Sequence, residues 1–153
     1  MSKNYVAIMA GGIGSRFWPK SRVAYPKQFI DILGLVKSLL QLTYDRFLQI
    51  VPKERIFIVT NADYEDLVKE QLPDLEDHQI LKEPLRRNTA PCIAYVSSKI
   101  YSIDPQANLV VAPSDHLVMN GEEFTRIITK ALGHVTKSSD LLTLGIVPTR
   151  PDT

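Results

Sequence analysis

A glycine-rich segment with cations around it is the part of the sequence best suited to chemistry. Residues 9–19 read Met-Ala-Gly-Gly-Ile-Gly-Ser-Arg-Phe-Trp-Pro and follow a short apolar run. Glycines placed after a strand let the backbone turn sharply and bring N–H groups close to a phosphate. The first thirty residues hold five Lys or Arg and no acid, whereas the remainder holds thirteen Lys or Arg and seventeen Asp or Glu. This local positive charge predicts a compact anionic ligand such as a polyphosphate, and not a nucleic acid.

Two familiar phosphate-binding motifs do not fit this segment. The pattern G-x-x-x-x-G-K-[ST] is absent, and the dinucleotide pattern lacks its third glycine because Phe17 stands there. The dinucleotide pattern also requires a helix that starts at the loop, and Pro19 and Pro26 argue against a regular helix across residues 16–28. We therefore expect the loop to hold phosphates with cationic side chains and backbone N–H groups.

Short apolar runs alternate with helical patterns along the chain, which predicts βαβ units. We predict strands at Tyr5–Ala10, Arg55–Thr60, Gln79–Glu83, Asn108–Ala112 and Leu141–Ile146. We predict helices at Ser38–Ile50, Ala62–Leu72, Thr89–Ile103 and Gly121–Lys137, with Ser38, Thr89 and Asn120 as helix starts. The fold class is therefore α/β, with a mostly parallel sheet covered by helices on both faces in three layers.

Composition sets the broad class of the protein. Of its 153 residues, 44% are hydrophobic and 23% are charged, and the net charge is +1, as in ordinary globular domains. The single cysteine, Cys92, excludes an internal disulfide, and we interpret it as a small buried residue. No apolar run approaches the roughly 18 residues that span a bilayer. We expect a soluble cytoplasmic protein that binds neither nucleic acid nor membrane.

Four segments in order resemble the signature of the nucleotide-sugar pyrophosphorylases. The first is the glycine segment with Phe17-Trp18-Pro19, continued by Tyr25-Pro26-Lys27-Gln28-Phe29. The later ones are Glu83–Pro91, Pro113–His116, and Leu144–Ile146 with its Pro-Thr-x-Pro-x-Thr tail. The Phe-Trp-Pro and Pro-Lys-Gln-Phe variants are similar to the mannose-1-phosphate guanylyltransferase branch of that family. The resemblance implies a Rossmann-like nucleotide-diphospho-sugar transferase fold.

The reaction implied by the resemblance joins GTP and mannose 1-phosphate into GDP-mannose and pyrophosphate, with Mg²⁺ as cofactor. The attacking phosphate oxygen is already an anion, so no general base is needed. Positioning and electrostatic stabilisation then have to supply most of the acceleration. We interpret residues 1–153 as the N-terminal, nucleotide-binding part of such an enzyme, truncated at the C-terminus and inactive alone. A homodimer of the full-length protein is a further expectation.

The resemblance also implies roles for individual residues. Arg16, Lys27 and Asp115 would be catalytic, with Arg16 and Lys27 contacting phosphates and Asp115 binding Mg²⁺ at a strand end. The nucleotide would be bound by Gly11, Gly12, Gly14, Ser15, Arg16, Lys27, Glu83, Asn88, Thr89 and Ala90. Within this set the carboxylate of Glu83 suits the two N–H donor positions of guanine.

Each assignment has an alternative. Asp115 could cap a turn, Asn88 and Thr89 could cap a helix, and Glu83 could pair with Arg86 or Arg87. His116 could orient Asp115, touch the substrate or make a structural hydrogen bond. Lys20 and Arg22 could contact the ligand or could simply be solvated. We interpret His78 and His134 as surface residues.

Three alternatives remain for the whole protein. It could be a pyrophosphorylase for another nucleoside triphosphate or another sugar 1-phosphate. It could also be a non-catalytic relative that binds a nucleotide-sugar without turnover, although retention of Arg16, Lys27 and Asp115 together argues against that. A dinucleotide-binding oxidoreductase is the most distant alternative.

Overall fold

The computed structural model describes residues 3–12, 19–83 and 88–145. These residues form a four-stranded parallel sheet in the order β3-β2-β1-β4. The strands are β1 (Asn4–Met9), β2 (Ile56–Asn61), β3 (Ile80–Glu83) and β4 (Asn108–Pro113). The α-helices are α1 (Leu39–Leu48), α2 (Glu65–Gln71), α3 (Thr89–Ile103) and α4 (Gly121–Val135). The predicted α/β class with a parallel sheet is confirmed.

The central strand, β1, is apolar because it is buried on both faces. Its residues Val6, Ala7 and Ile8 are fully buried, and β1 pairs with β2 on one side and with β4 on the other. Side chains along a strand alternate between the two faces. Val6 and Ile8 therefore enter one core, and Tyr5 and Ala7 enter the other.

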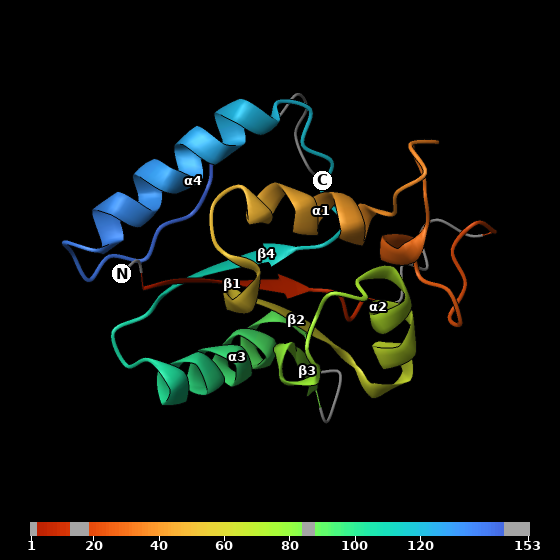
Figure 1. Ribbon diagram of the computed structural model, residues 1–153, viewed down its shortest axis with the longest axis horizontal. Coiled ribbons are helices and arrows are strands. Elements are labelled where there is room, and N and C mark those ends of the chain that lie inside the picture. The colour runs from red at the N-terminus through yellow and green to blue at the C-terminus, as the bar shows by residue number, and fades with distance from the viewer. Residues whose placement is uncertain (1–2, 13–18, 84–87, 146–153) are drawn as a thin grey trace, which may run out of the picture.

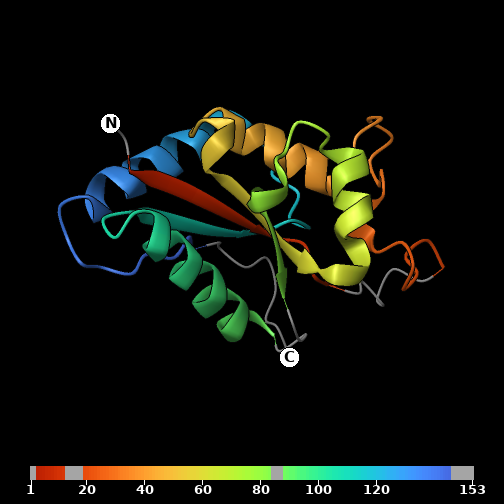
Figure 2. The same cartoon turned by 60° about the horizontal axis from the view of Figure 1, so that its bottom comes forward.

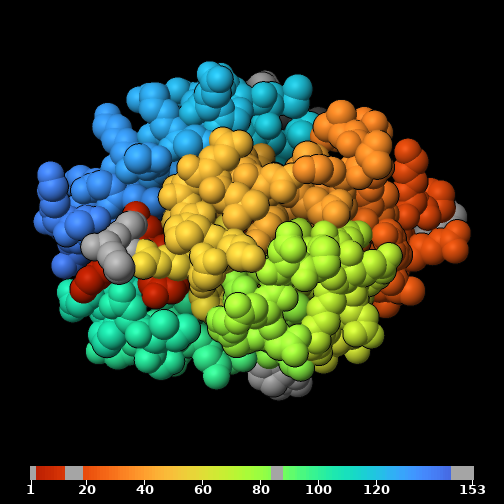
Figure 3. Space-filling view, viewed as in Figure 1, coloured from red at the N-terminus to blue at the C-terminus, as the bar shows by residue number. Residues whose placement is uncertain are grey.

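Helices cover both faces of the sheet, as the three-layer prediction requires. α1, α2 and α4 lie on one face and α3 lies on the other (Figures 1 and 2). α1 and α4 are neighbours on their face (Figure 3), where the rings of Phe47 and Phe124 meet edge to face with centroids 5.6 Å apart. On the opposite face, Val96 and Ile100 of α3 are buried against the sheet.

The order in which strands are added to the sheet reverses at β1, although all four strands run parallel. From β1 the chain adds β2 and then β3 on one side, and it returns to place β4 on the other side of β1. In open parallel sheets, ligands bind beyond the carboxyl ends of the strands at this reversal. The reversal therefore marks the end of the sheet between β1 and β4 as the expected binding edge.

Local hydrogen bonds explain where α1 and α4 begin. Ser38 caps α1 with a reciprocal pair of bonds, because its hydroxyl accepts from the N–H of Gln41 at 3.2 Å and its own N–H donates to Gln41 Oε1 at 2.9 Å. Asn120 caps α4 by accepting from the N–H of Glu123 at 3.0 Å. Both helix starts were predicted.

Among the described residues, four short 3₁₀ turns flank the strands and helices: η2 (Lys27–Phe29), η3 (Lys53–Arg55), η4 (Ala62–Tyr64) and η5 (Asp77–Gln79). η4 occupies the start of the predicted helix Ala62–Leu72, so that α2 is shorter than expected. No helix within the described ranges has both the length and the apolar character needed to cross a membrane.

The strand predicted at Leu141–Ile146 is wrong over its described part. Residues 141–145 have no regular structure and pair with none of the described strands, and Leu141 is 99% exposed. A strand is stabilised by a hydrogen-bonded neighbour and by burial of one face. An apolar run in a sequence shows neither the neighbouring strand nor the buried face, so the pattern alone could not establish a strand here. Ile146 lies outside the described residues.

The capping arrangement predicts the effect of one substitution. Ser38→Ala removes both the acceptor for the Gln41 N–H and the hydroxyl that donates to Gln71 Oε1, and we expect it to lower the free energy of unfolding by at least about 1 kcal/mol. Urea denaturation measures this change. The same substitution at Ser98, an exposed residue within α3, is the control and should change stability by less than about 0.5 kcal/mol. Equal effects of the two substitutions would contradict the capping role.

Candidate active site

The carboxyl ends of β1 and β4 bring two loops together. β1 continues into the described part of the glycine segment, Ala10–Gly12, and β4 continues into Ser114 and Asp115. Met9 and Pro113 are paired in register, and the N–H of Ser114 donates to the carbonyl of Met9 at 3.1 Å. The parallel pairing therefore places Asp115 beside the glycine segment.

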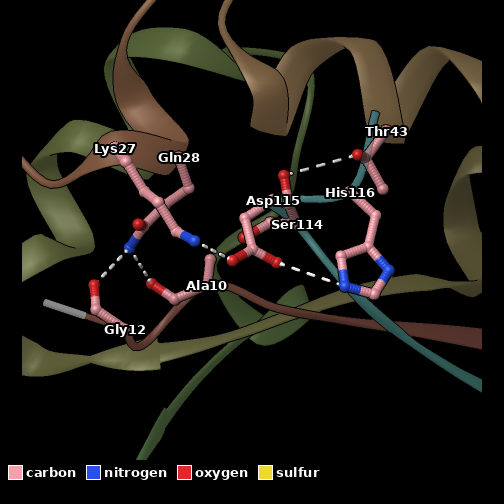
Figure 4. Close-up of polar contacts among 8 residues, drawn as sticks. All are labelled: Ala10, Gly12, Lys27, Gln28, Thr43, Ser114, Asp115 and His116. Atoms are coloured by element: carbon pink, nitrogen blue, oxygen red, sulfur yellow. Dashed lines mark hydrogen bonds and ion pairs between the residues drawn. The ribbon is translucent and has the colours of Figure 1, made fainter. Parts of the chain in front are cut away.

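Lys27 reaches this edge from a 3₁₀ turn, η2 (Lys27–Phe29). Its Nζ forms an ion pair with Oδ2 of Asp115 (Figure 4), and the two side chains remain 23% and 28% exposed. Phe29 anchors the turn, because its ring packs against Tyr64 and its carbonyl accepts from Gln71 Nε2 at 2.8 Å. Two predicted site residues thus meet, and both remain accessible to a ligand.

Gln28 lies between Lys27 and Phe29 in η2 and is not among the predicted site residues. Its side chain is 1% exposed, and its Nε2 donates to the carbonyls of Ala10 and Gly12, both at 2.9 Å (Figure 4). The hydroxyl of Thr60, also buried, donates to the same carbonyl of Ala10 at 3.1 Å. The position of Gln28 beside Lys27 in the Pro-Lys-Gln-Phe segment was the signal in the sequence.

Helix α1 supports the loop that carries Asp115. The hydroxyl of Thr43, on α1, lies 3.5 Å from the carbonyl oxygen of the buried Ser114. Arg46 donates to that hydroxyl at 2.9 Å and stacks over the ring of Phe124 on α4. The backbone before Asp115 therefore rests on packed side chains of two helices.

Glu83 lies at the end of β3 and contacts the glycine segment. A Cβ added at Gly11 would stand 3.2 Å from Oε2 of Glu83, so the absence of a side chain at Gly11 lets the carboxylate approach. Cys92, in the first turn of α3, donates its thiol hydrogen to Glu83. Burial, together with the Glu83 charge, raises the pKa of the Cys92 thiol to about 12. Cys92 is therefore the small buried residue that was predicted.

Asn88, Thr89 and Ala90 are exposed at the N-terminus of α3, close along the chain to Glu83. Asn88 occupies the N-cap position, but its side chain makes no capping hydrogen bond, which contradicts the simple capping alternative for this residue. Its φ of 65° and ψ of −169° belong to a region normally reserved for glycine. Backbone strain of this kind is typical of functional sites.

Several predicted residues fall outside the described ranges. These are Gly14, Ser15 and Arg16 of the glycine segment, together with the possible Glu83 partners Arg86 and Arg87. Lys20 and Arg22 lie within the described ranges and are exposed to solvent, as expected if they are solvated surface residues.

The three histidines are all exposed. His116 Nε2 lies 4.0 Å from Asp115 Oδ1, which is too long for the hydrogen bond that would orient the carboxylate. His78 and His134 were predicted to be surface residues, and they lie beside Glu76 and Asp140.

Asp115 is the candidate ligand for a divalent cation. Within the described ranges, no group of three or more His, Cys, Asp or Glu could hold a metal ion on its own. Magnesium at nucleotide sites is usually held by one or two carboxylates, with substrate phosphates and waters completing the shell. One accessible carboxylate beside a glycine segment fits that arrangement.

A family model described as "Nucleotidyl transferase" matches residues 5–153. The matched range begins in β1 and includes the glycine segment, Lys27 and Asp115. The chain belongs to the nucleotidyl transferase family. The juxtaposed loops of this nucleotidyl transferase thus lie within the region that the family model describes.

This nucleotidyl transferase resembles proteins named mannose-1-phosphate guanylyltransferase. It is 39% identical over 148 residues to one from Salmonella montevideo and 38% identical over 156 residues to one from Escherichia coli. These alignments cover 95% and 99% of the chain but only 30% and 32% of the two relatives. The chain therefore spans about a third of the length of these relatives.

Solved structures support the same architecture. A Thermus thermophilus structure titled mannose-1-phosphate geranyltransferase has a TM-score of 0.77 and 31% identity, covering 88% of this nucleotidyl transferase chain and 39% of its own. A Helicobacter pylori structure titled mannose-6-phosphate isomerase has a TM-score of 0.66 and 27% identity, covering 85% and 45%. Both likenesses agree with the parallel α/β fold.

The environment of Cys92 predicts low reactivity. Because the thiolate is the reactive form, a buried thiol of raised pKa should react with a disulfide reagent at least about 10²-fold more slowly than in denaturant. Mass spectrometry of the labelled Cys92 peptide measures the rate at mildly alkaline pH. Glu83→Gln should accelerate labelling, whereas Glu76→Gln, an exposed control, should not. Rapid labelling of the folded parent would contradict this burial.

Proposed function

We propose that the protein transfers GMP from GTP to mannose 1-phosphate, giving GDP-mannose and pyrophosphate. Residues 1–153 would supply the GTP and Mg²⁺ part of the site. The observation that carries the choice of substrates is the similarity, over 95% and 99% of the chain, to two mannose-1-phosphate guanylyltransferases. The meeting of Lys27 and Asp115 beside the glycine segment supports the type of reaction.

The reaction is mainly an electrostatic problem. A phosphate oxygen of the sugar attacks the α-phosphorus of the nucleotide, a new P–O bond forms, and the bond to pyrophosphate breaks. The attacking oxygen is already negative, so the chain needs no base to remove a proton. Two polyanions must instead be held in line while charge accumulates on the departing pyrophosphate.

The ion pair between Lys27 and Asp115 provides opposite charges for this purpose. In the structure the two groups form an ion pair, so that each neutralises the other. When substrates bind, the Lys27 ammonium would turn to a phosphate, and Asp115 would hold Mg²⁺. The bound ion would neutralise phosphate oxygens and help to stabilise the leaving group. Arg16 would contact the departing pyrophosphate, as its sequence position suggests.

The backbone and the β3 end would bind the rest of the nucleotide. The N–H groups of Gly11 and Gly12, with Gly14 and Ser15, would line the phosphate path. The Glu83 carboxylate, which lies against Gly11, would accept from the two N–H donor positions of guanine. The exposed residues that begin α3, Asn88, Thr89 and Ala90, would complete the contacts to the nucleotide.

A substrate panel tests the proposed function. We expect pyrophosphate release by the full-length protein to be fastest with GTP and mannose 1-phosphate, because Glu83 favours a base with two donors. GTP should be compared with ATP and UTP, and mannose 1-phosphate with glucose 1-phosphate. Preference for another pair would make the protein a different pyrophosphorylase. Nucleotide binding without any release of pyrophosphate would instead indicate a non-catalytic relative.

Asp115→Asn tests the assignment of the metal ligand. Loss of the carboxylate charge should reduce turnover at least about 10²-fold, the scale of losing one group that stabilises the transition state. The control is Asp45→Asn, which removes the carboxylate of another Lys–Asp ion pair, on α1. Turnover of the control should match the parent. Parent-like turnover of Asp115→Asn, with an unchanged melting curve, would remove Asp115 from the mechanism.

A further inference from the structure

The side-chain amide of Gln28 holds two peptide groups of the glycine segment. A side-chain amide has two N–H donors, and Nε2 of Gln28 donates to the carbonyls of Ala10 and Gly12. The side chain is buried, so water does not compete for these donors. Gln28 therefore fixes the direction of two carbonyl groups immediately after β1.

Fixing a carbonyl also fixes the N–H group of the same peptide unit. In a trans peptide the C=O and N–H bonds lie in one plane and point in opposite directions. The carbonyl of Ala10 points toward the buried Gln28 and Thr60. The N–H of Gly11 belongs to the same peptide unit and must point away from these two side chains.

We propose that Gln28 is a positioning residue that aims the N–H of Gly11 at the phosphates of the bound nucleotide. This inference rests on the proposed function, and it concerns a residue that need not touch the substrate. The amide acts through the backbone of the glycine segment, on the side opposite to the ligand. Its loss would leave the loop in place but free its peptide units to rotate.

Together with Lys27, the residue before it, Gln28 connects the glycine segment with Asp115. Lys27 precedes Gln28 on η2, and it contacts Asp115 while Gln28 contacts the glycine segment (Figure 4). One short turn therefore connects the loop after β1 with the loop after β4. Gln28 sets the spacing between the N–H donors of the first loop and the opposite charges of Lys27 and Asp115.

The chain contains a matched control for this role. Gln79 is 2% exposed, and its Nε2 likewise donates to two backbone carbonyls, those of Lys53 and Ile56, at 2.6 and 2.7 Å. These carbonyls belong to η3 and to the first residue of β2, at the end of the parallel sheet opposite to the site. Gln79 thus has comparable burial and the same pair of donor contacts without contact to the glycine segment, and its Oε1 also accepts from the N–H of Glu76 at 3.0 Å.

The experiment compares Gln28→Leu with Gln79→Leu in the full-length protein. Both substitutions remove two buried donors, so both should lower the melting temperature. Only Gln28→Leu should weaken binding of GTP with Mg²⁺, by about tenfold or more, and lower kcat/KM by about 10²-fold. The KM for GTP should rise more than the KM for mannose 1-phosphate. Titration calorimetry and pyrophosphate release provide the two measurements.

The positioning role is overturned if Gln28→Leu keeps the affinity and turnover of the parent, or if both variants lose them equally. If Gln28→Leu does not fold, Thr60→Val removes the other donor to the Ala10 carbonyl and keeps the side-chain shape. That variant should bind the nucleotide more weakly, and parent-like affinity in it would also overturn the proposal.

The behaviour of the parent protein separates this inference from the proposed function. A parent that binds another nucleoside triphosphate, or that binds without turnover, contradicts the proposed function alone. The affinity comparison, made with the nucleotide that the parent binds, then still decides the role of Gln28. A parent that binds no nucleoside triphosphate overturns both.

Discussion

β1 lies between β2 and β4 in the sheet. Its parallel pairing with β4 determines where the residues of the candidate site meet. Because both strands end at the same edge, the glycine segment and Asp115 become neighbours although they are about a hundred residues apart. The turn η2 can then contact both loops, through Lys27 and Gln28. An antiparallel β4, or a β4 placed beyond β3, would carry Asp115 away from Lys27. The remaining contacts of the site depend on this pairing.

Two carboxylates lie near the glycine segment, and their different partners suit different tasks. Asp115 is paired with the ammonium of Lys27, which stands on a long flexible side chain. When Lys27 moves away, the carboxylate of Asp115 can therefore pair with another cation. Glu83 contacts a neutral thiol that is buried and fixed in α3. This hydrogen bond comes from a neutral group, so it constrains the carboxylate without adding a positive charge. The first arrangement suits a group that binds an incoming ion, and the second suits a rigid acceptor for a base.

The sequence located most of the elements and predicted a parallel sheet between helices, but it did not determine the order of the strands. Apolar runs located four strands because buried parallel strands need side chains that are apolar on both faces. The same signal failed at Leu141–Ile146, since it contains no information about a pairing partner. The contact of Lys27 with Asp115 depends on strand order, and alternating β and α segments are compatible with several orders. Gln28 stood within the Pro-Lys-Gln-Phe segment but received no role, because a polar residue in a motif does not reveal that its side chain is buried against the backbone.

The two loops of the site rest on strands of different local stability. Among the described strands, β1 has a neighbour on each side, and its residues Val6 to Ile8 are fully buried. β4 is bonded to β1 alone in that part of the sheet, and all its residues are partly accessible. In the part of the chain that the structure describes, we therefore expect the amide hydrogens of β1 to exchange with solvent more slowly than those of β4. The glycine segment consequently follows the more protected of the two strands, and Asp115 follows the more accessible one.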